Sequence, residues 1–533
     1  MIHERQTIVS RSLDSPAPSQ AGWAVPRPAT RVLQLVGARA DQVMFAVALV
    51  AGSALRLWHI NSSGFNSDEA VYAGQAAALA GDPELSKFFP IFRAHPMLFQ
   101  FLLSIMYRVH FSDVGARLLI VAIGLVTIIL IYKVGALLYG TSIGALAALL
   151  MAVMPYHVIV TRQVLLDGPL TLCTTLTLYL VARFALSHRP IYLYATGASL
   201  GLVFLAKETG FVLAAAVYAF FALTPQIRIR IRDLILSGLV MMVPIAAYPM
   251  STALAGRSDT AKGYLVWQLF RRSNHSWTFF PTVVPPAIGP LVLIAAVAGL
   301  WFLRRERSWR ETLLISWILV PCFVFQLWPV KGFQYLLPVA PAIAILASRA
   351  LIRVPAVLLV HRRAFAPALR AVLIAVVLLS LTLVTWDRLQ PPTSATLLAG
   401  AGGMPGGRET GEWIAESTPE NSVFLTVGPS MANIIQFYGH RKAYGLSVSP
   451  NPLHRNPSYE PVQNADLMIR SGQAQYIVFD AFSASRTDYF TKRLNDLVEK
   501  YDGRVVHVEY MPGADPGPEG YPPRIIIVYE VYP

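Results

Sequence analysis

Long apolar runs separated by short polar segments fill most of the chain between residues 41 and 388. The first run contains MFAVALVAGSALRLWHI, and a helix of about 20 apolar residues is long enough to cross a bilayer. The pattern therefore predicts a polytopic α-helical membrane protein. Its eleven expected spans are residues 41–60, 115–138, 142–160, 167–186, 190–206, 208–224, 233–254, 285–303, 311–329, 332–351 and 368–388.

A shorter apolar run at residues 95–109 is flanked by charge and could span or lie in the interface. If it lies in the interface and the N-terminus is cytoplasmic, every dense arginine cluster between later spans faces the cytoplasm, as the positive-inside rule requires. We therefore expect a multi-pass cell-membrane protein with a disordered cytoplasmic tail at residues 1–40. Outer loops are expected at residues 61–114 and 255–285, with everything after Trp386 also outside.

The C-terminal part of the chain has a different pattern. A Gly-rich linker at residues 391–408 precedes short apolar runs such as SVFLTV, QYIVFD, RVVHVEY and RIIIVYEV, which alternate with helical segments. This alternation predicts a small soluble α/β domain at residues 409–533. The topology places that domain on the extracytoplasmic side.

Composition agrees with a membrane protein, because 55% of residues are hydrophobic and only 14% are charged, whereas about 25% charged is typical of soluble domains. The chain has 44 Lys and Arg against 30 Asp and Glu. These cations cluster in short loops between apolar runs, which is a topology signal, so no nucleic-acid partner is expected. Cys173 and Cys322 lie inside apolar runs and are expected to pack there.

The segment GFNSDEAVYAG places two adjacent carboxylates, Asp68 and Glu69, directly after the first span. Asn66 could cap a helix in which Glu69 completes a capping box, so a purely structural role is one interpretation. A catalytic carboxylate is the other.

Further polar residues lie at the same membrane surface, and each alone could be a helix-end charge in contact with water. Together they suit a cleft that holds an anionic lipid headgroup beside a general base. They are Asp167 and Tyr335 with the basic residues Arg93, His95, Arg162, Lys207, Arg271, Arg272, His275 and Lys331.

The motifs SDEAVYA, AHPM, TRQVLLDGPL, GLVFLAKETG and VKGFQYLLPVAPAIAIL follow one another across about residues 40 to 350. In this order they resemble the GT-C glycosyltransferases, in particular the branch of the lipid A aminoarabinose transferases and protein O-mannosyltransferases. The resemblance implies transfer of a sugar, with inversion, from a polyprenyl-phosphate donor to an acceptor hydroxyl on the extracytoplasmic face. The implied partners are that donor, membrane lipids, and a lipid, glycan or protein acceptor.

The resemblance also implies roles for single residues. It makes Asp68 the catalytic carboxylate and Asp167 a supporting acid. Glu69 is a second supporting acid, although it points about 100° away from Asp68 on a helix and capping is its favoured role. The residues expected to bind the donor phosphate are His95, Lys331, Tyr335, Arg93, Lys207, Arg271 and Arg272.

Two positions differ from the aminoarabinose transferase pattern. Val71 stands where those enzymes have an arginine, and Ala94 where they have an acid before the phosphate-site lysine. The resemblance therefore does not extend to the sugar. No metal ligand or cofactor is assigned, and a divalent metal stays open.

A transporter or flippase of the same lipid-linked sugar is the alternative function. Transporters commonly show repeats and broken helices near the membrane midplane, whereas here the polar residues gather at one face and no repeat is visible. A glycan-binding scaffold would leave the outer acids unexplained. The loop at residues 255–285 mixes aromatic and cationic residues, and we expect it to be mobile and to close over the donor site.

Overall fold

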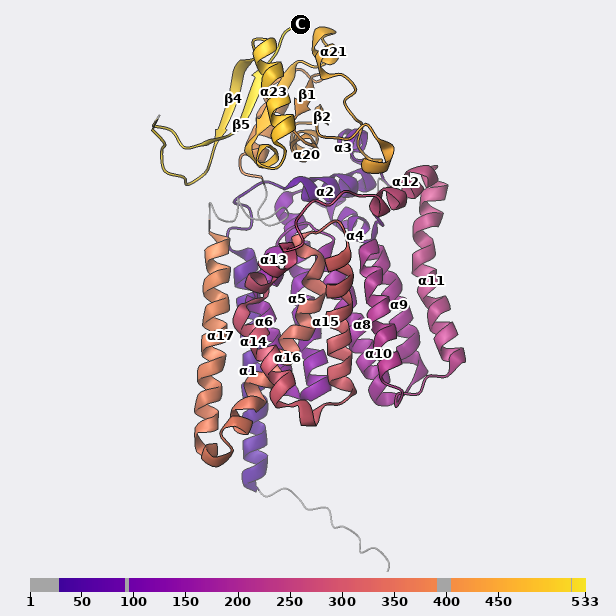
Figure 1. The fold of residues 1–533 in the computed structure, drawn as a ribbon, viewed down its shortest axis with the longest axis vertical. Helices are drawn as coiled ribbons and strands as arrows, with labels where there is room; N and C mark the ends of the chain where they lie inside the picture. Colours follow the sequence, from indigo (N-terminus) through magenta and orange to yellow (C-terminus); the bar gives the residue numbers. More distant parts are fainter. Residues whose placement is uncertain (1–27, 92–94, 391–403, 519) are drawn as a thin grey trace, which may run out of the picture.

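The structure is a computed structural model that describes residues 28–91, 95–390, 404–518 and 520–533. A bundle of long helices carries a small α/β domain at one end (Figure 1). Helices α2 (Ser67–Ala80) and α12 (Ser258–Leu269) lie at that same end of the bundle. The polar segments between helices at this end therefore lie between two layers of protein.

Seven helices within the described residues are long and apolar enough to cross a membrane. They are α1 (Pro28–Leu57), α5 (Asp113–Tyr139), α8 (Asp167–Ser187), α11 (Ile231–Leu254), α15 (Trp309–Leu327), η3 with α16 (Phe333–Val339 and Ala340–Leu358), and η4 with α17 (Val360–Phe365 and Ala366–Leu389). Shorter apolar helices fill other expected spans, namely α6 (Thr141–Val153), α9 (Pro190–Ala206), and η1 with α10 (Glu208–Phe211 and Val212–Leu223). The polytopic helical fold class is confirmed.

The span expected at residues 285–303 is a broken helix pair. Its residues lie in α13 (Phe279–Ile288) and α14 (Pro290–Phe302), which meet at an angle of 91°. Gly289 between them has a φ of +99°, a conformation that glycine adopts without the steric cost of a Cβ atom. The short helix η2 (Arg304–Glu306) follows α14.

The span expected at residues 142–160 is also divided, because α6 ends at Val153 and α7 (Pro155–Val160) begins after Met154. Proline has no N–H to continue the helical ladder. The Ala152 carbonyl, in the last turn of α6, accepts a hydrogen bond from the buried guanidinium of Arg56 at 3.0 Å. Arg56, from the first span, thus supplies a hydrogen-bond donor to a carbonyl beside the break.

Helix α4 (Leu98–Tyr107) forms from the run that we expected to lie in the interface. Its ten residues extend about 15 Å, roughly half the thickness of a hydrocarbon core. The helix packs against α2, and α3 (Pro83–Phe88) lies between them in the sequence. The length agrees with a helix that does not cross the bilayer.

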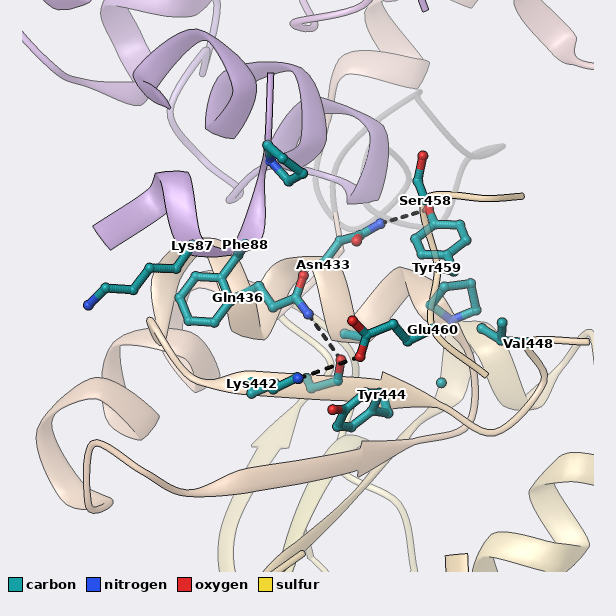
Figure 2. A pocket seen from close by; sticks show the side chains of 15 residues that line it. Lys87, Phe88, Asn433, Gln436, Lys442, Tyr444, Val448, Ser458, Tyr459 and Glu460 are labelled. Carbon is teal, nitrogen blue, oxygen red and sulfur yellow. Dashed lines mark hydrogen bonds and ion pairs between the residues drawn. The ribbon is translucent and has the colours of Figure 1, made fainter. Parts of the chain in front are cut away.

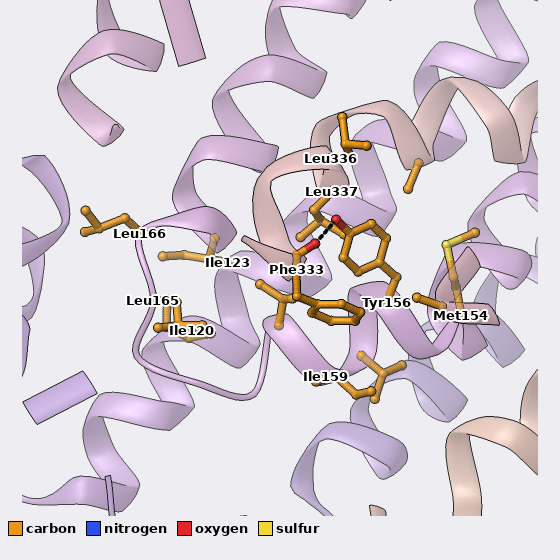
Figure 3. Packing of buried hydrophobic residues seen from close by; sticks show 14 of the residues in the cluster. Ile120, Ile123, Met154, Tyr156, Ile159, Leu165, Leu166, Phe333, Leu336 and Leu337 are labelled. Atoms are coloured by element: carbon orange, nitrogen blue, oxygen red, sulfur yellow. Dashed lines mark hydrogen bonds between the residues drawn. The ribbon is translucent and has the colours of Figure 1, made fainter. Parts of the chain in front are cut away.

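A buried cluster fixes η3 against the bundle. The hydroxyl of Tyr156 in α7 donates to the carbonyl of Phe333, and Ile120, Leu165 and Leu336 pack around this pair (Figure 3). Because η3 also carries a residue expected at the site, this packing positions part of the polar end of the bundle.

The C-terminal domain is built on a five-stranded sheet in the order β2-β1-β3-β5-β4. Strands β2, β1 and β3 are parallel, and β5 is antiparallel to both β3 and β4. The strands are β1 (Val423–Thr426), β2 (Lys442–Gly445), β3 (Tyr476–Asp480), β4 (Arg504–Tyr510) and β5 (Arg524–Glu530). The helices are α19 (Gly407–Ser417), α20 (Pro429–Tyr438), η5 (Pro452–His454), α21 (Ala465–Arg470), α22 (Ala481–Ala484) and α23 (Asp488–Lys500).

The predicted α/β class of this domain is confirmed, but β2 was not predicted, because its four residues KAYG show no alternating pattern. Two expected boundaries also differ. Residues 28–40 belong to α1 and not to a disordered tail, since the helix begins at Pro28, a residue well suited to a first turn. The expected linker lies outside the described residues up to 403, and α19 already begins at Gly407.

Candidate active site

The start of α2 has the capping box that the sequence predicts. The Asn66 side chain accepts hydrogen bonds from the backbone N–H groups of Asp68 at 2.9 Å and Glu69 at 3.0 Å. The Glu69 carboxylate accepts the N–H of Asn66 at 3.0 Å in return. Both acids therefore lie in the first turn, where the helix dipole favours negative charge.

Glu69 is fully buried and holds α2 in place. It forms an ion pair with Arg117 of α5 at 3.1 Å, and its other oxygen accepts the backbone N–H of Val164 at 2.9 Å. It lines neither of the two cavities described next. Its contacts are those of a structural residue that fixes the helix carrying Asp68.

Asp68 lies at the junction of two adjoining cavities. The larger, here called the central cavity, has a volume of about 260 Å³, and the smaller, here called the cationic cavity, about 160 Å³. Both are lined by Asp68, Arg271, Gln334 and Tyr335. A group in either cavity can therefore reach the same carboxylate.

The central cavity combines aromatic rings with both charged and neutral hydrogen-bonding groups. His95 Nδ1 lies 2.9 Å from Glu208 Oε2, and the hydroxyl of Tyr264 in α12 donates to Glu208 Oε1 at 3.0 Å. His95 and Glu208 are therefore already paired with each other. The other lining residues are Tyr72, Lys207, Thr209, Trp267, Gln268, Asn456 and Tyr459.

Asp167 and Lys207, both expected at the site, form a buried pair. The Lys207 ammonium group donates to both carboxylate oxygens of Asp167 at 2.9 Å, and it lies 4.8 Å from the centre of the Tyr335 ring. Lys207 lines the central cavity, whereas Asp167 lines neither cavity. Asp167 therefore contacts a residue of the central cavity without lining that cavity itself.

The cationic cavity contains an excess of positive charge. Arg271, Lys331 and Arg486 line it together with His275, and Asp68 is the one carboxylate among its lining residues. The buried Lys331 ammonium group donates to the Trp328 carbonyl at 3.0 Å. Such a set of fixed cations suits a phosphate group.

Arg486 was not predicted from the sequence. It follows α22 in the C-terminal domain, and nothing in the segment FSASRTDYF indicates contact with a membrane-domain cavity. Arg272 is exposed and lines neither cavity. Arg162 lies away from both and donates to the Trp58 carbonyl at 2.5 Å, and Arg93 lies outside the described residues.

Burial raises the pKa of Asp68, while the positive charges of Lys207 and His95 act in the opposite direction. The side chain is exposed where it faces the two cavities, but the protein around those cavities limits the bulk water that would stabilise its charge. A carboxylate in this setting is a stronger base than an aspartate on the open surface. It can also still be reached by a substrate.

The segment at residues 255–285 is largely structured, since α12 lies within it. Tyr264, Gln268 and Arg271 of this segment line the central cavity. The expected closing movement stays a prediction.

The C-terminal domain contacts both sides of the α2 N-terminus. The Tyr438 hydroxyl accepts the N–H of Phe65 at 2.9 Å, and Asn433 donates to the hydroxyl of Ser67 at 2.9 Å. Arg408 pairs with Asp113 of α5 at 2.9 Å. These contacts were not predicted, because they join residues more than 290 positions apart in the chain.

Within the described residues, no group of three or more His, Cys, Asp or Glu side chains is arranged to hold a metal ion. Glu69, Asp167 and Glu208 instead pair with Arg117, Lys207 and His95.

Comparison with known proteins adds a family match and several structural matches. The family model of dolichyl-phosphate-mannose-protein mannosyltransferases matches residues 94–252. A sequence comparison with curated proteins gives no match.

Among solved structures, ArnT from Cupriavidus metallidurans in the apo state has a TM-score of 0.65 and 15% identity, over 93% of this chain and 98% of that chain. ArnT bound to undecaprenyl phosphate has a TM-score of 0.62 and 17% identity, over 91% and 97% of the two chains. The oligosaccharyltransferase AglB from Archaeoglobus fulgidus, in complex with an inhibitory peptide and a dolichol-phosphate, has a TM-score of 0.57 and 14% identity, over 91% and 74%. The chain therefore has the fold of the GT-C glycosyltransferases, and its resemblance to the branch of lipid A aminoarabinose transferases and protein O-mannosyltransferases is confirmed.

Proposed function

We propose that the protein is a membrane glycosyltransferase that moves a sugar from a polyprenyl-phosphate donor to an acceptor hydroxyl, with inversion at the anomeric carbon. The observation that carries this proposal is the position of Asp68 between the cationic cavity and the central cavity. A base beside a cation-lined pocket is what displacement of a phosphate by a hydroxyl requires.

The donor phosphate binds in the cationic cavity. Lys331, Arg271 and Arg486 supply positive charge from three separate segments, and charge-assisted hydrogen bonds from such groups stabilise both the bound phosphate and the charge that develops as it leaves. The undecaprenyl phosphate bound to ArnT and the dolichol-phosphate bound to AglB support this class of donor.

The acceptor hydroxyl approaches from the central cavity. Its oxygen forms a bond to the anomeric carbon while the bond from that carbon to the phosphate oxygen breaks, and the leaving polyprenyl phosphate takes the electron pair. Asp68 accepts the hydroxyl proton. Attack and departure then lie on opposite sides of the sugar, as inversion requires.

The reaction takes place on the extracytoplasmic face. The arginine-rich connection that contains Arg228 and Arg230, between α10 and α11, lies at the end of the bundle opposite the C-terminal domain (Figure 1). Clusters of this kind favour the cytoplasm. The site and the C-terminal domain are then outside, where nucleotide sugars are scarce and a lipid-linked donor is suitable.

The test uses the purified protein in vesicles that contain a radiolabelled polyprenyl-phosphate sugar, with cell-envelope glycans, lipids or peptides as acceptors. We expect the label to move to an acceptor without any energy source, and Asp259→Asn, which neutralises an exposed carboxylate of α12, to behave like the unmodified protein. Movement of the labelled lipid across the bilayer with no glycosylated product would contradict the proposal and support the transporter.

A further inference from the structure

A third cavity lies between the bundle and the C-terminal domain, and the mechanism above leaves it without a role. Its volume is about 330 Å³, larger than either cavity at Asp68, and ligand sites commonly begin at about 300 Å³. Lys87 and Phe88 of α3 form one wall, while α20 and β2 form the other (Figure 2). We call it the interdomain cavity.

The interdomain cavity adjoins the central cavity. Tyr459 lines both of them. Asn433, which also lines the interdomain cavity, donates a hydrogen bond to the Tyr459 hydroxyl at 3.2 Å (Figure 2). It donates a second one to the Ser67 hydroxyl at 2.9 Å. Ser67 directly precedes Asp68. A molecule in the interdomain cavity therefore lies beside Tyr459, which also lines the central cavity in front of Asp68.

The lining has the chemistry of a site for a neutral, hydroxyl-rich ligand. Phe88, Tyr444 and Tyr459 supply aromatic rings, and Asn433 and Gln436 supply side-chain amides. Aromatic faces cover the C–H faces of a sugar ring. The Asn433 amide already donates to Ser67 and Tyr459 and the Gln436 amide to the Ala443 carbonyl, so what these side chains offer hydroxyl groups is mainly their acceptor oxygens.

The charges of the cationic cavity favour an anion, whereas the charges of the interdomain cavity do not. Lys442 pairs with Glu460 across the opening at 3.5 Å, and both side chains are exposed (Figure 2). Lys87 forms an ion pair with Glu84 at 2.7 Å. Each lysine of the lining therefore has a carboxylate partner, and a phosphate or a lipid tail would find little complementarity here.

We infer that the interdomain cavity binds the acceptor and that this acceptor is a carbohydrate. The inference rests on the proposed function, because it places the acceptor chain on the side of Asp68 opposite the donor phosphate. The cationic cavity, Asp68, the central cavity, Tyr459 and the interdomain cavity follow one another in that order. An inverting transfer needs this order, with the leaving group and the acceptor on opposite sides of the donor sugar.

The experiment measures binding to the full purified chain in detergent, with a panel of fluorescent neutral oligosaccharides, a panel of peptides, and undecaprenyl phosphate as separate probes. Phe88→Ala removes a ring from the bundle wall and Tyr444→Ala one from the domain wall, so a folding defect in one variant leaves the other informative. The matched control is Tyr489→Ala, which removes an exposed ring of α23 that lines none of these cavities.

We expect at least one oligosaccharide to bind, and each of the two cavity variants to weaken that binding by about tenfold, the loss expected when one stacking ring is removed. Undecaprenyl phosphate binding should stay unchanged in all three variants. Binding of peptides only, no oligosaccharide binding at all, or oligosaccharide binding that both cavity variants retain would overturn the inference. Cavity-dependent oligosaccharide binding in a protein that transfers no sugar would support this site and contradict the proposed function instead.

Discussion

The hydroxyl of Tyr438, in the C-terminal domain, accepts a hydrogen bond from the backbone N–H of Phe65 at 2.9 Å. Phe65 lies just before the helix that carries Asp68. The same hydroxyl donates to Asp113 at 2.5 Å, so one side chain of the domain joins α5 to the start of α2. The domain therefore helps to hold the helix that carries Asp68, the proposed base.

Tyr438→Phe tests that relationship. The substitution keeps the ring but leaves the Phe65 N–H and the Asp113 carboxylate without this partner, which costs about 1–3 kcal/mol in buried surroundings. We expect turnover to fall while binding of undecaprenyl phosphate persists, because the cationic cavity keeps its residues. Tyr489→Phe is the control, and equal turnover in the two variants would show that the contact does not position Asp68.

Glu69→Gln should affect stability more than chemistry. The buried Arg117 would lose its carboxylate partner, and breaking a buried ion pair from one side costs about 3–5 kcal/mol. We expect a lower melting temperature and a smaller yield of folded protein, with turnover per folded molecule changed much less than in Asp68→Asn. A stable Glu69→Gln protein without activity would mean that Glu69 takes part in the reaction.

Lys331→Met and Arg486→Ala should each weaken binding of the donor phosphate. Both side chains line the cationic cavity, and loss of one charge-assisted contact corresponds to about tenfold or more in affinity. The measurement is the dissociation constant for undecaprenyl phosphate. Arg272→Ala is the control, because it removes a neighbouring exposed arginine that lines neither cavity. If Arg272→Ala lost as much affinity as Lys331→Met and Arg486→Ala, only the overall charge would matter.

Asp480 predicts a pH dependence of stability in the C-terminal domain. Burial raises the pKa of this carboxyl from 3.8 to about 6, and one of its oxygens has no hydrogen-bond partner. The folded state therefore binds the proton more tightly than the unfolded state. The stability contributed by the protonated form is complete below about pH 4 and is lost as the pH rises through about 6.

Asp480→Asn should remove this loss of stability with rising pH. It keeps an oxygen that can accept the Ser483 N–H and carries no charge, so at pH 7 it should stabilise the protein by up to about 3 kcal/mol. Thermal melting between pH 4 and 8 is the measurement, with Asp466→Asn as the control at a half-buried, ion-paired carboxylate whose pKa is lowered instead of raised. A variant whose melting temperature falls with rising pH as steeply as the unmodified protein would contradict the assignment.

Local patterns in the sequence predict the features that depend on local physics. The apolar runs predict helices because the length of each run is set by the bilayer. The capping box of Asn66 and Glu69 is confirmed, since its residues lie three positions apart and need no distant partner. The alternation after residue 409 likewise predicts the α/β domain.

The remaining features depend on contacts between distant segments. The sequence singles out Asp167 and Lys207 separately, but only the fold shows that they pair and leave Asp167 outside both cavities. The sequence gives no signal for Arg486 or Tyr438. Arg486 lines a cavity whose other lining residues belong to the membrane domain, and Tyr438 bonds to Phe65 there. The break at Pro155 is visible in the sequence, whereas the buried Arg56 that donates to a carbonyl beside it is not.

The most direct test of the account is the turnover of Asp68→Asn, measured beside its undecaprenyl phosphate binding and its melting temperature. Asparagine keeps the size of the side chain but cannot accept the acceptor's proton, so we predict that turnover falls by about two orders of magnitude or more while binding and melting persist. An Asp68→Asn protein that binds the lipid, melts normally and still transfers sugar at a near-normal rate would contradict the assignment of Asp68 as the base.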